Sequence, residues 1–255
     1  MWPVSHPDGG LVVLATSRGR GAHVTVSATM AGRGRTGGHG HDDAGSYEYW
    51  SGEPIVVDRG TGSYTGDVLL RELHRSVLSH SVVQVDGRDQ NPPVPGKPFR
   101  RIDRALPHVT SFDGSGGGTV ELGHSGYLVA PGRVSAWRRL HLREDGTLEV
   151  DDELRGAGAH DVALRVQWAP GLAVLPAPAI GETRVLEARR DGRLVARLTV
   201  EARDAAGHAR PLDVTCVPAR HSWRQGAEEA AVTTVLAVRG GLPLRLRHVL
   251  STGGT

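Results

Sequence analysis

Alternation of apolar and polar residues runs through most of this 255-residue chain and constrains its fold more than any other feature. Successive side chains of a strand point to opposite faces of a sheet, so the alternation indicates strands that each bury one face. The pattern is clearest in residues 23–30, 162–168, 194–201, 232–238 and 244–250. It predicts an all-β chain whose strands cover a common core.

Asp-Gly pairs recur between these segments, at residues 8–9, 86–87, 113–114, 145–146 and 191–192. Such a pair is a strong hairpin signal, because a type I′ turn needs positive φ at both central residues. The pairs at 145–146 and 191–192 are predicted to join consecutive strands. Many short strands with Gly-rich turns favour a multi-stranded antiparallel two-sheet β-sandwich. All-β chains of this length often form one domain, so we expect one domain over residues 1–255.

Only one segment has a convincing helical pattern. In residues 67–77, the side chains of Leu69, Leu70, Leu73 and Val77 recur at helical spacing and are expected to share one face. The sequence therefore predicts a single short helix within an otherwise strand-rich chain.

Composition argues against several classes of function. Charges nearly balance, with 30 Lys+Arg against 28 Asp+Glu, and only 4% of residues are aromatic, so nucleic-acid binding is not expected. No run of about 18 apolar residues exists, and we expect no membrane-spanning helix. Cys216 is the only cysteine, which excludes an internal disulfide and predicts a buried, inert thiol in a strand.

The N-terminal residues have neither the charged region nor the apolar region of a signal peptide. A strand is predicted almost at once, at residues 11–15. Such an abrupt start is expected of the C-terminal part of a longer protein, and also of a compact one-domain protein.

Residues 37–46, Gly-Gly-His-Gly-His-Asp-Asp-Ala-Gly-Ser, form the densest group of chemistry-bearing side chains. In an extended segment, His39, His41 and Asp43 would share one face. Two imidazoles this close can share a metal ion, or one can bind the metal while the other carries protons. The chain has 13 histidines, so a histidine-rich surface turn also explains the pattern.

Asp58 and His80 are further candidates for the same site. Asp58 ends the apolar run 55–57, where it could project from a sheet rim or simply cap a turn. His80 is expected in a strand over residues 75–86, where a hydrogen-bonded structural histidine is the simpler interpretation. With His41, the two would form a His₂-carboxylate set with an open position, the composition of catalytic zinc.

Three segments, residues 38–48, 55–64 and 75–90, resemble in order and spacing the C-terminal part of the heparinase II/III family of polysaccharide lyases. The resemblance implies a β-sandwich that normally follows an (α/α) toroid, which is absent from these residues. It also implies a Zn²⁺ ion held by His41, Asp58 and His80, and a catalytic histidine at His39. The implied reaction is β-elimination on a polysaccharide that contains uronic acid.

Two departures from the family pattern affect this interpretation. The family usually has asparagine where this chain has Ser81, which weakens the expected support of His80. The catalytic tyrosine of the family belongs to the toroid, and we expect Tyr47 and Tyr64 to pack or to bond at the sheet rim instead.

The sequence thus predicts the β-sandwich part of a polysaccharide lyase for an acidic substrate. Its expected partner is an N-terminal toroid, and its expected location is periplasmic, in the cell envelope or secreted. Two alternatives remain: a non-catalytic carbohydrate-binding or structural module, and a metal-dependent hydrolase that uses the same ligands.

Overall fold

The computed structural model describes residues 3–6, 9–16, 21–28, 38–224 and 226–252. Three predicted features fall partly outside these ranges, at Asp8 of the first Asp-Gly pair, Met30 of a predicted strand and Gly37 of the histidine cluster. Within the described residues, no helix has the length and apolar character needed to cross a membrane.

Four antiparallel sheets account for the described strands, and the largest has eight. Its order is β14 (Ala173–Ile180), β15 (Thr183–Arg190), β16 (Arg193–Asp204), β19 (Leu244–Thr252), β12 (Leu148–Arg155), β11 (Ser135–Leu142), β10 (Thr119–His124) and β9 (His108–Asp113).

The other sheets are smaller. The five-stranded sheet has the order β1 (Val4–His6), β2 (Leu11–Ala15), β3 (Ala22–Ser27), β4 (Tyr47–Ser51) and β5 (Pro54–Val56). The four-stranded sheet has the order β17 (Asp213–Arg224), β18 (Ala227–Gly241), β13 (Ala159–Gln167) and β6 (Val83–Val85). The two-stranded sheet pairs β7 (Pro93–Val94) with β8 (Lys97–Arg101).

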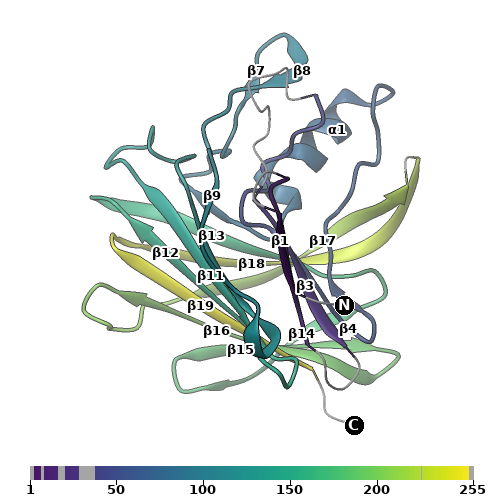
Figure 1. The fold of residues 1–255 in the computed structure, drawn as a ribbon, viewed down its shortest axis with the longest axis vertical. Coiled ribbons are helices and arrows are strands. Elements are labelled where there is room, and N and C mark those ends of the chain that lie inside the picture. The colour runs from purple at the N-terminus through teal and green to yellow at the C-terminus, as the bar shows by residue number, and fades with distance from the viewer. Residues whose placement is uncertain (1–2, 7–8, 17–20, 29–37, 225, 253–255) are drawn as a thin grey trace.

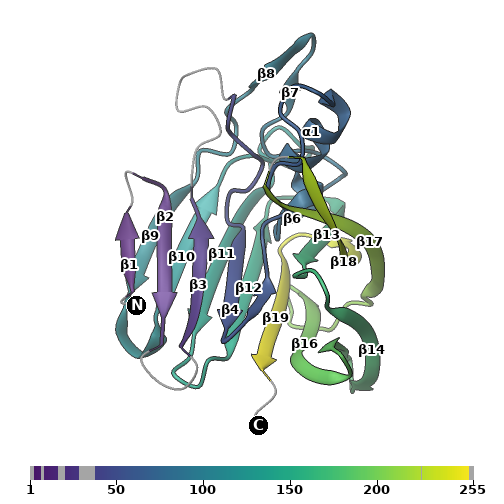
Figure 2. The ribbon, with the colours of Figure 1, turned by 90° about the vertical axis from the view of Figure 1, so that its right-hand side faces the viewer.

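The predicted β-sandwich is confirmed. The eight-stranded sheet forms one layer, and the five- and four-stranded sheets lie against it as the second layer (Figures 1 and 2). One apolar core joins them, with Val24 from the five-stranded sheet, Leu164 from the four-stranded sheet and Leu246 from the eight-stranded sheet. Alternation along β19 places Leu246 in this core and Arg245 on the outer face. Burial of one side of each strand therefore drives the layering.

The five-stranded and four-stranded sheets meet at a seam between β5 and β13. The amide of Val57 donates to the carbonyl of Gln167, and the amide of Ala169 donates to the carbonyl of Ile55. The donor–acceptor distance is 3.0 Å in both bonds. Val56 and Trp168 form an isolated bridge between these bonds. The chain leaves the sandwich at this seam and enters the segment that begins with Asp58.

Both hairpins predicted from Asp-Gly pairs are present. Asp191 and Gly192 have φ of 49° and 80° between β15 and β16, as a type I′ turn requires. The pair at 145–146 joins β11 to β12 with positive φ only at Gly146, so this turn is wider than a two-residue turn. The pair at 113–114 leads into β10 through the short 3₁₀ helix η2 (Ser115–Gly117).

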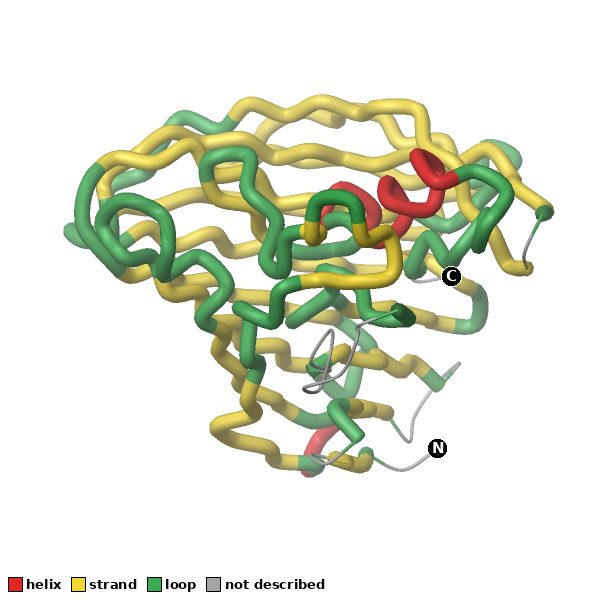
Figure 3. Tube along the Cα trace, turned by 90° about the horizontal axis from the view of Figure 1, so that it is seen from above, coloured by secondary structure: helices red, strands yellow, loops and turns green. Residues whose placement is uncertain are grey.

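The predicted helix exists, and it buries its polar face rather than its apolar one. Helix α1 (Val68–Arg75) begins after Asp67, whose side chain caps it by accepting from the amide of Leu70. Its buried residues are Arg71, His74 and Arg75, while Leu69 is 84% exposed. The polar face is buried because its side chains hold a neighbouring loop, as described below. In Figure 3 the helix is drawn red among the green loops at one end of the sandwich.

Two predictions are wrong. His80 is not in a strand: it follows the 3₁₀ helix η1 (Val77–Ser79), and β6 begins three residues later. Cys216 does lie in a strand, but it is exposed because β17 is an edge strand whose residues 215–218 are exposed on both faces.

Candidate functional site

His41, Asp58 and His80 come together at the end of the sandwich that carries α1. One potential ligand atom from each residue lies within 4.8 Å of the other two. Nδ1 of His80 is 2.6 Å from Oδ2 of Asp58, and the His41 and His80 rings are 5.2 Å apart at their centroids. Three distant segments, before β4, after β5 and before β6, thus converge on one point.

Electrostatics gives His41 and Asp58 the charge states that a metal site needs, whereas His80 would have to lose a proton to bind a metal ion. Burial lowers the pKa of His41 to about 3, so its imidazole is neutral at ordinary pH. Burial opposes ionisation of Asp58, but the charge and hydrogen bond of His80 outweigh it and lower the pKa of Asp58 to about 2. For His80, burial lowers the pKa, but Asp58 reverses the effect and leaves it raised.

The donor set fits a divalent metal ion. Two imidazoles and one carboxylate are typical ligands of zinc in sites that keep a position open. Nε2 of His80 is buried and has no hydrogen-bond partner within the described part of the chain. A buried polar atom without a partner is costly, and such an atom calls for a specific explanation. An ion bound among these three residues would supply positive charge and hold their segments together.

The loop after Asp58 is held in a strained, specific shape. Oδ1 of Asp58 accepts from the amide of Gly60 over 2.8 Å. Gly60 has a φ of 69° and pairs with Ser222 of β17, and a Cβ at this position would clash with the carbonyl oxygen of Ser222. Glycine is therefore required here, and the turn aims the Asp58 carboxylate at His80.

The buried arginines of α1 hold the loop that bears His39 and His41. Nη2 of Arg71 donates to the carbonyl of Gly38, and Nε of Arg75 donates to the carbonyl of Gly40. The donor–acceptor distance is 3.0 Å in both bonds. These bonds explain why α1 buries its polar face, since charge-assisted bonds to buried carbonyls need the cations on the inner face. They also fix the backbone on either side of His39.

Asp42 and Asp43 have supporting positions. Asp42 is fully buried, forms an ion pair with Arg101 and accepts from the amide of Asn91 over 2.8 Å. Asp43 accepts from the Ser27 hydroxyl over 2.9 Å and is not among the three grouped ligand candidates. Both acids thus anchor the loop between the two histidines and β4.

His39 is exposed and lies beside Tyr64. The Tyr64 hydroxyl contacts Nδ1 of His39 within hydrogen-bonding range, and the Arg71 guanidinium lies 5.8 Å from the centre of the Tyr64 ring. The sequence-based expectation for Tyr64 was packing or a rim hydrogen bond, and its contact with a candidate proton carrier is more specific than that. A signal existed in the sequence, because Tyr64 follows Asp58 by only six residues.

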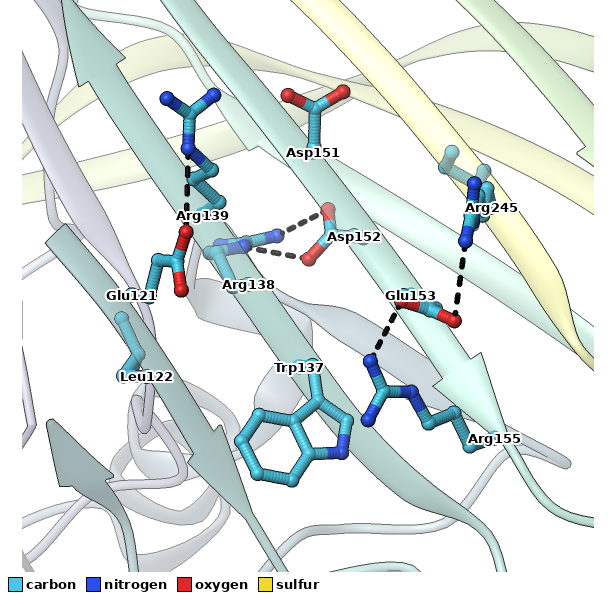
Figure 4. A pocket seen from close by; sticks show the side chains of 11 residues that line it. Glu121, Leu122, Trp137, Arg138, Arg139, Asp151, Asp152, Glu153, Arg155 and Arg245 are labelled. Atoms are coloured by element: carbon cyan, nitrogen blue, oxygen red, sulfur yellow. Dashed lines mark hydrogen bonds and ion pairs between the residues drawn. The ribbon is translucent and has the colours of Figure 1, made fainter. Parts of the chain in front are cut away.

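A hollow of about 330 Å³ on the outer face of the eight-stranded sheet is a less suitable site (Figure 4). Glu121 pairs with Arg139, and Glu153 pairs with both Arg155 and Arg245. Because these charges already have partners, the hollow offers little unsatisfied chemistry, and it contains none of His39, His41, Asp58, Tyr64 and His80.

Fold and site together define a β-sandwich with a His₂-carboxylate centre at one end. The model of the family "Heparinase II/III-like, C-terminal" matches residues 3–241. The chain therefore belongs to the heparinase II/III-like C-terminal family. No curated protein sequence matches it.

Solved heparinases have the same fold. The heparan sulfate lyase HepC from Pedobacter heparinus superposes with a TM-score of 0.75 at 14% identity, covering 100% of this chain and 37% of that one. A heparinase III superposes with a TM-score of 0.74 at 16% identity, covering 99% of this chain and 36% of that one. This chain thus spans little more than a third of the length of these enzymes.

Proposed function

We propose that this chain is the β-sandwich part of a polysaccharide lyase that cleaves a uronate-containing polysaccharide by β-elimination. The observation that carries the proposal is the position of the exposed His39–Tyr64 pair, two residues along the chain from His41 of the His₂-carboxylate centre. The family membership of residues 3–241 supports the reaction class.

The chemistry of β-elimination suits these residues. The proton beside a uronate carboxylate is weakly acidic, so the reaction needs a base to remove it and an acid to protonate the departing glycosidic oxygen. His39 is accessible and carries one of these protons. The Tyr64 hydroxyl at Nδ1 orients the ring, leaving Nε2 for substrate. Zn²⁺ bound by His41, Asp58 and His80 supplies fixed positive charge that orders the loop.

The remaining catalytic groups belong to a partner domain. HepC and the heparinase III are far longer than this chain, and the partner expected from the family is an N-terminal (α/α) toroid. The outer face of α1 is suited to receive it, since Val68, Leu69 and Leu73 are exposed apolar side chains beside the site. An acidic polysaccharide substrate places the assembled enzyme in the periplasm, the cell envelope or the medium.

The proposal is tested by ultraviolet detection of unsaturated uronate, using a panel of acidic polysaccharides and an assembled protein that includes a toroid domain. His39→Ala is expected to lower turnover by about 10²–10⁴-fold, the usual contribution of a general acid or base, and to retain the metal. Turnover at the wild-type rate would show that His39 carries no proton.

The same assembled protein also distinguishes the lyase from the two alternative functions. A wild-type assembly that binds the polysaccharides but never forms unsaturated uronate would favour the carbohydrate-binding module. Cleavage that yields only saturated products would favour the metal-dependent hydrolase.

The partner surface has its own test. Leu69→Asp should change the unfolding free energy of the isolated chain by no more than about 0.5 kcal/mol, because the side chain is exposed. The same substitution should weaken association with the toroid domain, measured by sedimentation. Glu121→Gln on the outer sheet face is the control, and equal association of both variants would exclude this face of α1.

A further inference from the structure

A second pocket, of about 350 Å³, lies behind the segment that leads to His80. Ser76 and Leu78 line one side, and the residues that follow β6 line another. Its volume suits part of one saccharide unit rather than a whole oligosaccharide. Leu78 and Val129 are exposed apolar side chains in its wall, which suits the C–H face of a sugar ring.

Two arginines in this pocket have no partner. The guanidinium groups of Arg88 and Arg104 make no ion pair or hydrogen bond with any residue that the structure describes, unlike the paired arginines of the outer sheet face. Guanidinium presents a rigid set of donors that matches the oxygens of a carboxylate or sulfate. These donors are available to a ligand at no cost in broken protein contacts.

Gln84 adds an independent observation. Its side chain is only 7% exposed and lines the same pocket, yet its amide has no hydrogen-bond partner among the described residues. The amide atoms of Gln84 are not among the fully buried polar atoms without a partner, so they reach the pocket and can meet a ligand there. The amide can donate to the same acidic oxygens as the two arginines, or bond to a sugar hydroxyl.

The one acid in the pocket is already engaged elsewhere. Asp89 accepts from the amide of Val77 over 3.4 Å and lies 3.8 Å from Nη1 of Arg101. The negative charge of Asp89 is therefore shared between Arg101 and the pocket. The net charge of the residues that line the pocket is positive. A positive, partly apolar pocket selects an anionic ligand over a neutral one.

We propose that this pocket binds a carboxylate or sulfate of the acidic polysaccharide, at a saccharide unit away from the bond that is cleaved. The inference rests on the proposed function for the identity of the polymer. The segment between pocket and centre is rigid, since Nε2 of Gln167 donates to the carbonyls of Leu78 and His80 over 3.0 and 3.2 Å. A chain held at Arg88 and Arg104 is thereby placed at a constant distance from His80.

The test is calorimetric binding to this chain of a size-defined oligosaccharide of alternating glucuronate and N-acetylglucosamine. Its N-sulfated form and its neutral, carboxyl-reduced form are measured in parallel. The double variant R88Q/R104Q should bind the acidic oligosaccharide at least about tenfold more weakly, as expected for the loss of two charge-assisted contacts. The matched control R143Q/R245Q removes two exposed arginines from other surfaces and should bind like the wild type.

The outcomes separate this pocket from the lyase proposal. Tighter binding of the N-sulfated form that is lost in R88Q/R104Q assigns the pocket to sulfate, and equal binding of both acidic forms assigns it to the carboxylate. Undetectable binding by the wild type, equal binding by R88Q/R104Q, or equal binding of the neutral form and both acidic forms would overturn the pocket assignment. None of these results depends on formation of unsaturated uronate, which tests the lyase reaction separately.

Discussion

Two buried polar clusters in this sandwich differ in how completely their hydrogen bonds are satisfied. In the first, Arg138 donates to both carboxylate oxygens of Asp152 over 2.7 and 2.8 Å, and also to the carbonyls of Gly45 and Ser81. In the second, His80 bonds to Asp58 through Nδ1, while its buried Nε2 has no partner among the described residues.

The difference separates a structural cluster from a functional one. The Arg138 cluster is complete without a ligand, so its role is to connect β11 to the loops of the second layer. Figure 4 shows the paired side chains of Arg138 and Asp152. The His80 cluster is incomplete, and the structure bears the cost of a free nitrogen where a metal ion would bind. The two are connected, because the Ser81 carbonyl that Arg138 holds directly follows His80.

The largest expected effect is on the satisfied cluster. Asp152→Ala leaves the buried Arg138 charge without its partner, which should destabilise the fold by about 3–5 kcal/mol. Urea denaturation in the presence of a chelator measures this. Asp151→Ala is the matched control, because the neighbouring side chain is 37% exposed on the outer face and its loss should cost less than about 1 kcal/mol. Equal costs would remove the distinction between the clusters.

The next prediction concerns metal binding by the incomplete cluster around His80. Zinc at one hundred times its dissociation constant should raise the unfolding free energy of the wild type by about 2.7 kcal/mol. His41→Ala and His80→Ala should each abolish the increment, since each removes one of three ligands. His39→Ala is the control and should retain it. A chain that contains no metal after purification and whose melting ignores zinc would exclude the centre.

Acid should act through histidines that burial keeps neutral. Burial lowers the pKa of His124 to about 3 and that of His248 well below its usual 6.5. Below pH 6.5 the unfolded chain takes up protons that the folded chain excludes, so stability falls as pH falls, by up to about 1.4 kcal/mol per pH unit for each group.

This pH dependence can be assigned to one residue. His248 should contribute to this loss between pH 6.5 and 5, because its pKa is lowered on folding, and His248→Gln should make the decline shallower. Denaturation with a chelator present keeps metal binding out of the measurement. An unchanged slope in His248→Gln would show that His248 takes up its proton without unfolding, despite its contact with the Tyr47 hydroxyl.

Local patterns were sufficient for the sheets and poor for the site. Alternation in β19 and the Asp-Gly pairs after β11 and β15 correctly predicted strands and hairpins, because strand faces and turn geometry depend on neighbouring residues. The same reasoning was incomplete for α1, where Leu69 and Leu73 were expected to share one face but nothing indicated whether that face is buried. Apolar spacing shows that a helix is amphipathic, but not which of its faces the rest of the protein covers.

The site residues were first grouped from their chemistry, and the order and spacing of three segments then made that grouping specific. That resemblance singled out His41, Asp58 and His80, and the structure brings them together, although it tests neither the bound metal nor the proton transfer at His39. A hydrogen bond from Tyr64 at the sheet rim was among the expectations, but its partner, His39, could not be predicted because a position beside a strand says nothing of what the hydroxyl meets. The unpaired Arg88 and Arg104 had no signal at all, since a missing partner is visible only in three dimensions.

The sequence by itself determined an all-β sandwich and a short stretch dense in histidine and aspartate, since strand alternation and residue chemistry are written locally. Only the tertiary structure decided how that stretch is used. The seam between β5 and β13 brings Asp58 to His80, and the inward arginines of α1 hold the carbonyls on either side of His39. Contacts between residues this far apart in the chain form only when the layers pack, because burial of the common core sets which segments meet.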